Sequence, residues 1–124
     1  MRIAVAGGTG VVGRHTVDAA RAAGHDAVVL SRSAGADVTT GVGLADALQG
    51  VDAVIDVTNV STMSASVSVG FFETATRHLL AAEDAAGVGH HVALSIVGID
   101  GIDASYYAGK LAQERAVAAG AVPF

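Results

Sequence analysis

The chain has 124 residues, 52% of them hydrophobic, and a net charge of −5. It is long enough to form one domain with a buried core. The acidic balance and the scattered basic residues argue against nucleic-acid binding. The absence of cysteine excludes disulfides, thiolate nucleophiles and cysteine-ligated zinc.

The mean hydropathy of +0.53 is high for a water-soluble protein. No apolar run, however, reaches the roughly 18 residues that a membrane-spanning helix needs. The run that follows Arg2 is interrupted by glycines after four residues, unlike a secretion signal. We therefore expect a cytoplasmic protein that does not enter the membrane.

The first half of the chain alternates strands with helices. An apolar strand over residues 3–6 runs into a glycine-rich loop. A helix follows over residues 11–23, and Gly24 is the residue type that commonly ends a helix. Residues 26–30 predict a second strand, and residues 36–38 predict a weak third one.

The second half continues the same alternation. In chain order we expect a short helix at 44–48, a strand at 51–57, a Ser/Thr-rich connection at 58–68, a helix at 71–86, a strand at 91–95 and a helix at 106–119. This order predicts right-handed βαβ units and a three-layer α/β sandwich whose mostly parallel sheet has about five strands. Such sheets bind ligands at the carboxyl ends of their strands.

The pattern would begin a sixth strand at residues 121–124. We therefore expect a single domain over residues 1–124 that is incomplete at its C-terminus. An open sheet edge would then be available to a second copy of the chain or to another partner.

The glycine-rich loop reads Gly7-Gly8-Thr9-Gly10-Val11-Val12-Gly13. It satisfies the Gly-x-Gly-x-x-Gly fingerprint of dinucleotide-binding Rossmann folds, and it lies between a strand and a helix as that function requires. Glycines at these positions permit a tight turn, close approach of the backbone to a pyrophosphate, and close packing of helix on sheet. The alternative is a glycine-rich turn that binds nothing.

The residues after the second strand bear on which dinucleotide would bind. NAD sites usually place an Asp or Glu about 20 residues after the glycines, where it bonds the ribose 2′-hydroxyl. Here the sequence has Ser31, Arg32 and Ser33. A guanidinium flanked by hydroxyls suits a 2′-phosphate, so NADP is favoured and NAD stays an alternative. Arg32 could also be an ordinary exposed arginine.

The glycine loop, Ser31-Arg32, Asp37-Val38 and the segment Tyr106-Tyr107-Ala108-Gly109-Lys110-Leu111-Ala112-Gln113-Glu114 together resemble the atypical short-chain dehydrogenase/reductases. The likeness is greatest to NmrA-like and other NAD(P)-binding members, and it extends over essentially the whole chain. It implies that Asp37 and Val38 approach the adenine, and that Thr58, Asn59 and Val60 line the cofactor channel. Turn formation alone would also explain these polar residues.

A helix would place Tyr106 and Lys110 on one face, because they are four residues apart. The resemblance implies that Tyr106 transfers a proton, that Lys110 lowers the Tyr106 pKa and binds the cofactor's ribose, and that Ser95 polarises a carbonyl. A nearby ammonium would lower the phenol pKa from its usual value of about 10. Tyr107 could replace Tyr106, and the pair could also decorate a helix without catalysing anything.

The five histidines do not predict a metal site. His90 and His91 are adjacent, so a strand would direct them to opposite faces, and the others are dispersed. We therefore expect an NADP-dependent oxidoreductase that moves a hydride to or from a small carbonyl or quinone-like substrate. The alternative is a non-catalytic redox sensor of the NmrA-like type, in which a partner protein reads the bound dinucleotide.

Overall fold

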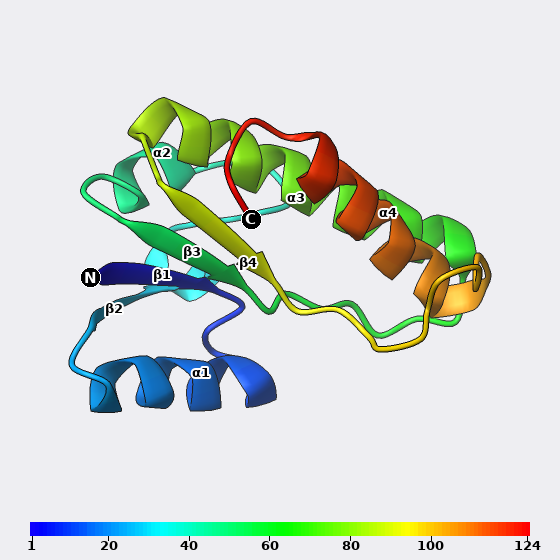
Figure 1. The fold of residues 1–124 in the computed structure, drawn as a ribbon, viewed down its shortest axis with the longest axis horizontal. Coiled ribbons are helices and arrows are strands. Elements are labelled where there is room, and N and C mark those ends of the chain that lie inside the picture. The colour runs from blue at the N-terminus through cyan, green and yellow to red at the C-terminus, as the bar shows by residue number, and fades with distance from the viewer.

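The computed structural model describes all of residues 1–124 and contains one parallel sheet (Figure 1). Its strands run in the order β2-β1-β3-β4. Their bounds are β1 Arg2–Ala6, β2 Asp26–Leu30, β3 Ala53–Asp56 and β4 His90–Ala93. In the shared register Ala4 lies between Val28 and Val54, and Val54 in turn pairs with His91. The α/β sandwich is thus confirmed.

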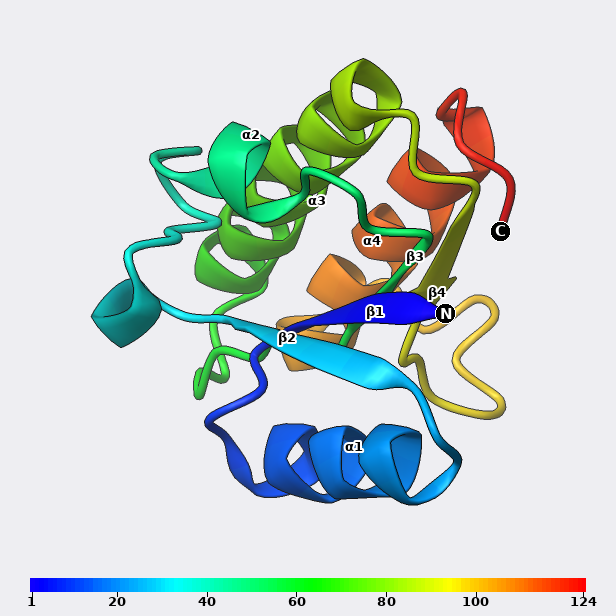
Figure 2. The same cartoon turned by 90° about the vertical axis from the view of Figure 1, so that its left-hand side faces the viewer.

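Helices cover the two faces of the sheet unequally. Helix α1 (Val11–Ala22) lies alone on one face, and helices α2 (Leu44–Ala47), α3 (Ala65–Ala86) and α4 (Ser105–Ala119) lie on the other side (Figure 2). None of the helices combines the length and apolar character that a membrane span requires.

The side chains of β1 point alternately to the two faces of the sheet, which explains why both faces are apolar. Ala4 and Ala6 belong to a cluster of ten buried apolar residues that includes Leu44 and Leu79 from the helices on the more heavily covered side. Ile3 and Val5 point the other way and pack with two buried residues of α1. Successive side chains of a strand point to opposite faces, so one short strand supplies both cores.

The sheet has four strands rather than five, so the prediction of a strand at residues 36–38 was wrong. The backbone N–H of Ala36 donates to the carbonyl of Ser31, and that of Asp37 donates to the carbonyl of Val42. A short 3-10 helix over Arg32–Ala34 precedes them. The backbone of this segment is thus hydrogen-bonded in local turns, and a ladder to β2 does not form.

Helix α3 begins six residues earlier than predicted, inside the supposed connection at 58–68. Its N-cap is Ser64, whose hydroxyl accepts a hydrogen bond from the backbone N–H of Val67 at 3.3 Å. Serine is a favoured N-cap, because it satisfies a backbone donor that the helix itself leaves free. The serines that suggested a loop are therefore part of the helix start.

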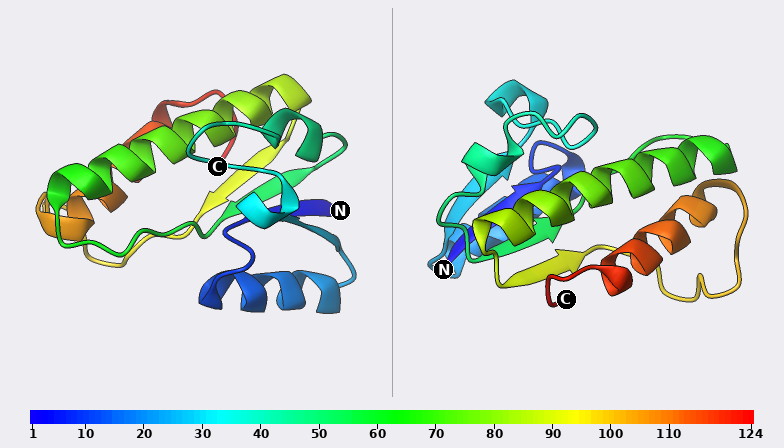
Figure 3. Two further views of the ribbon diagram at one scale, coloured as in Figure 1. Left: turned by 180° about the vertical axis from the view of Figure 1, so that it is seen from behind. Right: turned by 90° about the horizontal axis from the view of Figure 1, so that it is seen from above.

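The outer edge of β4 is partly covered by the end of the chain. The backbone N–H of His91 donates to the carbonyl of Pro123 at 2.8 Å, and Val122 is buried. The end of the chain lies beside β4 (Figure 3, right). On the face that α1 covers only in part, Val92 and Leu94 stay exposed. The predicted pairing of this edge with another chain stays a prediction.

Candidate functional site

The main cleft lies where β1, β2 and β3 end, at the carboxyl edge of the sheet. Its volume is about 610 Å³. It is lined by residues of the loops after β1, β2 and β3, by the start of α1, by the last residue of β2 and by one aromatic residue of α3: Gly7, Thr9, Gly10, Val11, Val12, Gly13, Leu30, Ser31, Arg32, Ala36, Asp37, Val38, Thr39, Val57, Thr58, Asn59, Val60 and Phe71. Parallel α/β sheets generally bind ligands at this edge.

The glycine loop leaves no room for a side chain at Gly7 or at Gly13. A Cβ atom on Gly13 would lie 1.9 Å from the carbonyl oxygen of Gly7, and Gly7 has a φ of +79°. Helix α1 begins directly after Gly10, which provides no side-chain cap. The first backbone N–H groups of α1 therefore have no intrahelical acceptor and can bind an anion. This cradle fits the pyrophosphate of a dinucleotide.

Gly8 differs from the other glycines of the loop because it does not line the cleft. A Cβ atom there would lie 3.0 Å from Cγ1 of Val29 and 3.4 Å from Cγ2 of Val17. Gly8 thus lets β2 and α1 approach each other behind the loop, and its part in cofactor binding would be indirect.

Arg32 is exposed and lines the cleft directly after β2. The hydroxyl of Ser31 accepts a hydrogen bond from the backbone N–H of Ala34 and lies 3.0 Å from the hydroxyl of Ser33. Ser33 itself does not line the cleft. The end of β2 therefore presents a guanidinium and one hydroxyl, at the place where an NAD-specific site would have a carboxylate.

Asp37 and Val38 also line the cleft, one turn beyond Arg32. The Asp37 carboxylate accepts hydrogen bonds from the hydroxyl of Thr39 at 2.7 Å and from its backbone N–H at 2.9 Å. These bonds, helped by Arg32, lower the pKa of Asp37. The carboxylate is thus ionised and already used in a turn.

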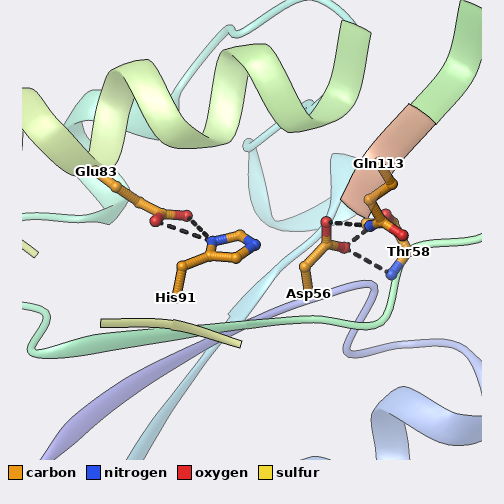
Figure 4. Close-up of polar contacts among 5 residues, drawn as sticks. All are labelled: Asp56, Thr58, Glu83, His91 and Gln113. Carbon is orange, nitrogen blue, oxygen red and sulfur yellow. Dashed lines mark hydrogen bonds and ion pairs between the residues drawn. The ribbon is translucent and has the colours of Figure 1, made fainter. Parts of the chain in front are cut away.

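The loop after β3 forms the remaining wall. Asp56, the last residue of β3, is buried and accepts hydrogen bonds from the backbone N–H of Thr58 at 2.9 Å and from its hydroxyl at 2.6 Å. Gln113 of α4 donates to the other carboxylate oxygen at 3.0 Å (Figure 4). Thr58 is thereby anchored while it faces the cleft together with Asn59 and Val60.

Tyr106 reaches the cleft through Asn59. Its phenolic hydroxyl donates to Oδ1 of Asn59 at 2.5 Å, and its backbone carbonyl accepts a hydrogen bond from Ser68 at 2.7 Å. Burial, and to a lesser extent the neighbouring phenol of Tyr107, raises the pKa of Tyr106. Tyr107 is 41% exposed, so Tyr106 is the better placed of the two tyrosines.

Lys110 hydrogen-bonds to residues other than Tyr106. Its ammonium donates to the carbonyl of Leu94 at 2.5 Å and to Oε1 of Gln113 at 2.6 Å, and it lies 4.6 Å from the centre of the Phe72 ring. Burial lowers the pKa of Lys110, although Asp56 and Glu114 oppose this change. Lys110 does not line the cleft, and its predicted contacts with Tyr106 and with a ribose are not among its polar contacts here.

Ser95 lies just beyond β4 and donates its hydroxyl to Oε1 of Glu114 at 2.5 Å. The structure therefore does not bring Ser95, Tyr106 and Lys110 into one hydrogen-bonded group. Their predicted catalytic roles stay predictions.

Sequence reasoning missed several residues of this region. Asp56 and Gln113 hold one wall of the cleft from behind, and Phe71 and Thr39 line it. Asp56 could have been found, because it is a polar residue at the carboxyl end of a predicted strand. No local pattern singles out Gln113.

His90 and His91 differ in burial, as expected for adjacent residues of one strand. His90 is exposed, whereas His91 is buried and lies 2.9 and 3.0 Å from the two carboxylate oxygens of Glu83 (Figure 4). The structure contains no group of three or more metal-ligating side chains.

Fold and site together define an α/β domain with a dinucleotide-type cleft. A family model described as the NAD dependent epimerase/dehydratase family matches residues 3–95. The chain therefore belongs to this family of NAD(P)-binding Rossmann proteins. No curated protein sequence matches the chain at a significant level.

Solved structures agree with this assignment. UDP-N-acetylglucosamine 4-epimerase from Bacillus cereus is 28% identical with a TM-score of 0.79, over 94% of this chain and 53% of that protein. A short-chain dehydrogenase/reductase superfamily protein from Agrobacterium tumefaciens, solved with bound NAD, is 25% identical with a TM-score of 0.76, over 98% of this chain and 47% of that one. A structure from Bacillus halodurans is 17% identical with a TM-score of 0.81, over 98% and 66%, and supports the fold alone. The chain thus spans about half the length of the first two.

Proposed function

We propose that the chain is the dinucleotide-binding part of an NADP-dependent oxidoreductase, which moves a hydride to or from a small carbonyl or quinone-like substrate. The observation that carries the choice of NADP is the exposed Arg32 on the cleft wall, where an NAD-specific site would have a carboxylate. The NAD bound to the Agrobacterium tumefaciens protein supports a dinucleotide in general and keeps NAD as the alternative.

The lining residues divide among the parts of the cofactor. The backbone N–H groups at the start of α1 would bind the pyrophosphate, with Gly7, Gly10 and Gly13 allowing its approach. Arg32 and Ser31 would bind the 2′-phosphate, since a guanidinium pairs bidentately with phosphate oxygens. The segment 37–38 would lie along the adenine, and the segment 58–60 would line the channel toward the nicotinamide.

The nicotinamide ring supplies the hydride when the cofactor is bound. Tyr106 would supply the proton from its phenolic oxygen. Its pKa is raised from the usual value of about 10, so the phenol is protonated at neutral pH and holds a proton that it could donate to a carbonyl oxygen as the carbonyl is reduced. Asn59 holds this hydroxyl beside the cleft wall.

A titration of the purified protein with NADPH and NADH tests the choice of cofactor. NADPH should bind more tightly, and Arg32→Ala should weaken NADPH binding by about 10- to 100-fold, because it removes a charged bidentate contact. NADH binding should change little. Arg115→Ala, an exposed arginine of α4 outside the cleft, is the matched control. If Arg32→Ala weakened the binding of NADPH and NADH equally, the assignment of Arg32 to the 2′-phosphate would be contradicted.

One observation favours a second function, that of a redox sensor which binds the dinucleotide without turnover. Ser95 is bonded to Glu114, and Lys110 is bonded to Leu94 and Gln113, so neither assists Tyr106. Tyr106→Phe separates the two functions. Loss of hydride transfer with intact NADPH binding supports the enzyme. The sensor is supported if the wild-type protein binds NADPH and transfers no hydride to any of a panel of carbonyl and quinone compounds.

A further inference from the structure

Lys110 is the only lysine in the chain, and it is only 4% exposed. Buried charges are normally paired with an opposite charge. The two hydrogen-bond acceptors of this ammonium are nevertheless both neutral, namely the carbonyl of Leu94 and the amide oxygen of Gln113. The nearby carboxylates of Asp56 and Glu114 raise the Lys110 pKa without bonding to the ammonium.

Asp56 is equally buried, at 1% exposed, and has no cation bonded to it. One of its carboxylate oxygens accepts both hydrogen bonds of Thr58, and the other accepts the amide N–H of Gln113. In Figure 4 Gln113 approaches Asp56 from α4, on the side away from the Glu83 and His91 pair. Asp56 therefore joins the cleft wall to α4.

Gln113 connects the two charges. A primary amide carries both a strong acceptor and two donors, so it can bond an ammonium on one side and a carboxylate on the other without a charge of its own. Gln113 is 1% exposed, and it makes both of these bonds.

We infer that Gln113 is a positioning residue with two roles. It holds the Lys110 ammonium beside the Leu94 carbonyl, at the carboxyl end of β4, and it holds Asp56 so that Thr58 keeps its place in the cleft wall. The part of this inference that concerns cofactor binding rests on the proposed function. The part that concerns Lys110 and Asp56 does not.

The groups around Lys110 determine its pKa, so that pKa reports whether Gln113 holds the ammonium. The end of β3 contributes the Asp56 carboxylate, the end of β4 the Leu94 carbonyl, and α3 the ring of Phe72. Helix α4 contributes Gln113 and the Glu114 carboxylate, which is itself bonded to Ser95. Gln113 is thus the one side chain that accepts a hydrogen bond from the ammonium.

The test is a pH titration of the Lys110 side chain by NMR, with lysine labelled at its ε-carbon, in the protein without cofactor. A single lysine gives one side-chain signal, and N-acetyl-lysine amide serves as the reference. Gln113→Met has similar volume and removes an acceptor of the ammonium, so the midpoint should fall below that of the wild type. Gln113→Glu keeps an acceptor and adds a negative charge, so the midpoint should rise.

A role in packing alone would not shift the midpoint in opposite directions. Equal midpoints in all three proteins, or shifts of the same sign in both variants, would overturn the inference. If Gln113→Met fails to fold by circular dichroism, Gln113→Glu decides: a raised midpoint supports the inference and an unchanged one overturns it.

The second measurement is NADPH affinity. Gln113→Met should raise the Kd by about threefold to tenfold, because the anchor of Thr58 loses one donor. Gln49 is the only other glutamine in the chain, and it is exposed. Gln49→Met is therefore the matched control and should leave the Kd unchanged. An unchanged Kd in Gln113→Met overturns the link to the cleft wall. A wild-type protein that binds neither NADPH nor NADH refutes the proposed function instead, and the lysine titration still decides the rest.

Discussion

Two regions of the molecule are built in different ways. The cleft beside the glycine loop is shaped by backbone, and it is open to solvent. Beneath α3 and α4 lies what we name the buried polar layer: Asp56, Glu83, His91, Lys110 and Gln113, each less than 5% exposed. Side chains from four separate elements make this layer. A backbone site depends on local sequence, whereas a side-chain layer depends on the whole fold.

This difference predicts that breaking the Glu83–His91 pair of the polar layer acts on stability, whereas altering the glycine loop acts on binding. The largest effect should follow a change that breaks a pair in the polar layer. Glu83 and His91 are each 0% exposed and bond to each other. Glu83→Leu leaves the imidazole buried without its partner, so the free energy of unfolding should fall by about 3–5 kcal/mol. Chemical denaturation measures this change.

The double variant Glu83→Leu with His91→Leu should regain most of that stability, because apolar side chains can replace a buried polar pair at little cost. NADPH affinity should stay the same in both proteins wherever they are folded. A double variant no more stable than Glu83→Leu alone would show that packing, and not the unpaired imidazole, causes the loss.

The second effect should fall on the cleft. Gly13→Ala places a Cβ atom 1.9 Å from the backbone oxygen of Gly7, so the loop has to move. Disturbing two hydrogen bonds to a charged pyrophosphate would weaken NADPH binding by about 100-fold, equivalent to about 2.7 kcal/mol. Titration with NADPH measures the loss, and thermal unfolding shows whether the fold survives.

Gly70→Ala provides the matched control for this change. Gly70 lies in α3 and is exposed, and a Cβ atom added there would meet nothing within 4 Å. Alanine there should stabilise the helix by about 0.5–1 kcal/mol and leave NADPH binding unchanged. If Gly13→Ala binds NADPH as well as Gly70→Ala does, the glycine loop is not the pyrophosphate site.

The same contrast explains what the sequence could reveal. The order of elements followed from local patterns. Thirteen of the sixteen predicted cofactor residues line one cleft; eight of them came from the glycine motif and the end of the second strand, and five came from the family resemblance. The strand expected at 36–38 failed because Ser31 and Val42 accept the backbone bonds of that segment. Lys110 was placed by its spacing from Tyr106, but spacing on a helix does not reveal whether a long side chain turns outward or into the core. That choice depends on Leu94, whose position relative to Lys110 comes only with the fold.

The smallest effect should arise at Tyr106, which lies on α4 and bonds to Asn59 of the cleft wall. Because its pKa is raised, any stability that this phenol contributes is fully present below its unfolded value near pH 10 and is lost as the pH rises through the folded value. The chain has two tyrosines and no tryptophan. In Tyr107→Phe, absorbance at about 295 nm therefore reports Tyr106 alone, the phenolate being the absorbing form of a group that ionises near pH 10.

The midpoint in Tyr107→Phe should lie above that of N-acetyl-tyrosinamide, because burial of the Tyr106 ring persists when the second phenol is removed. Adding Asn59→Ala should lower it, since Asn59 accepts a hydrogen bond only from the protonated phenol. If Asn59→Ala leaves the midpoint unchanged, the Tyr106 hydroxyl does not bond to the cleft wall. Tyr106 would then belong with the polar layer's helix alone, and its proposed proton transfer beside the dinucleotide would lose its structural basis.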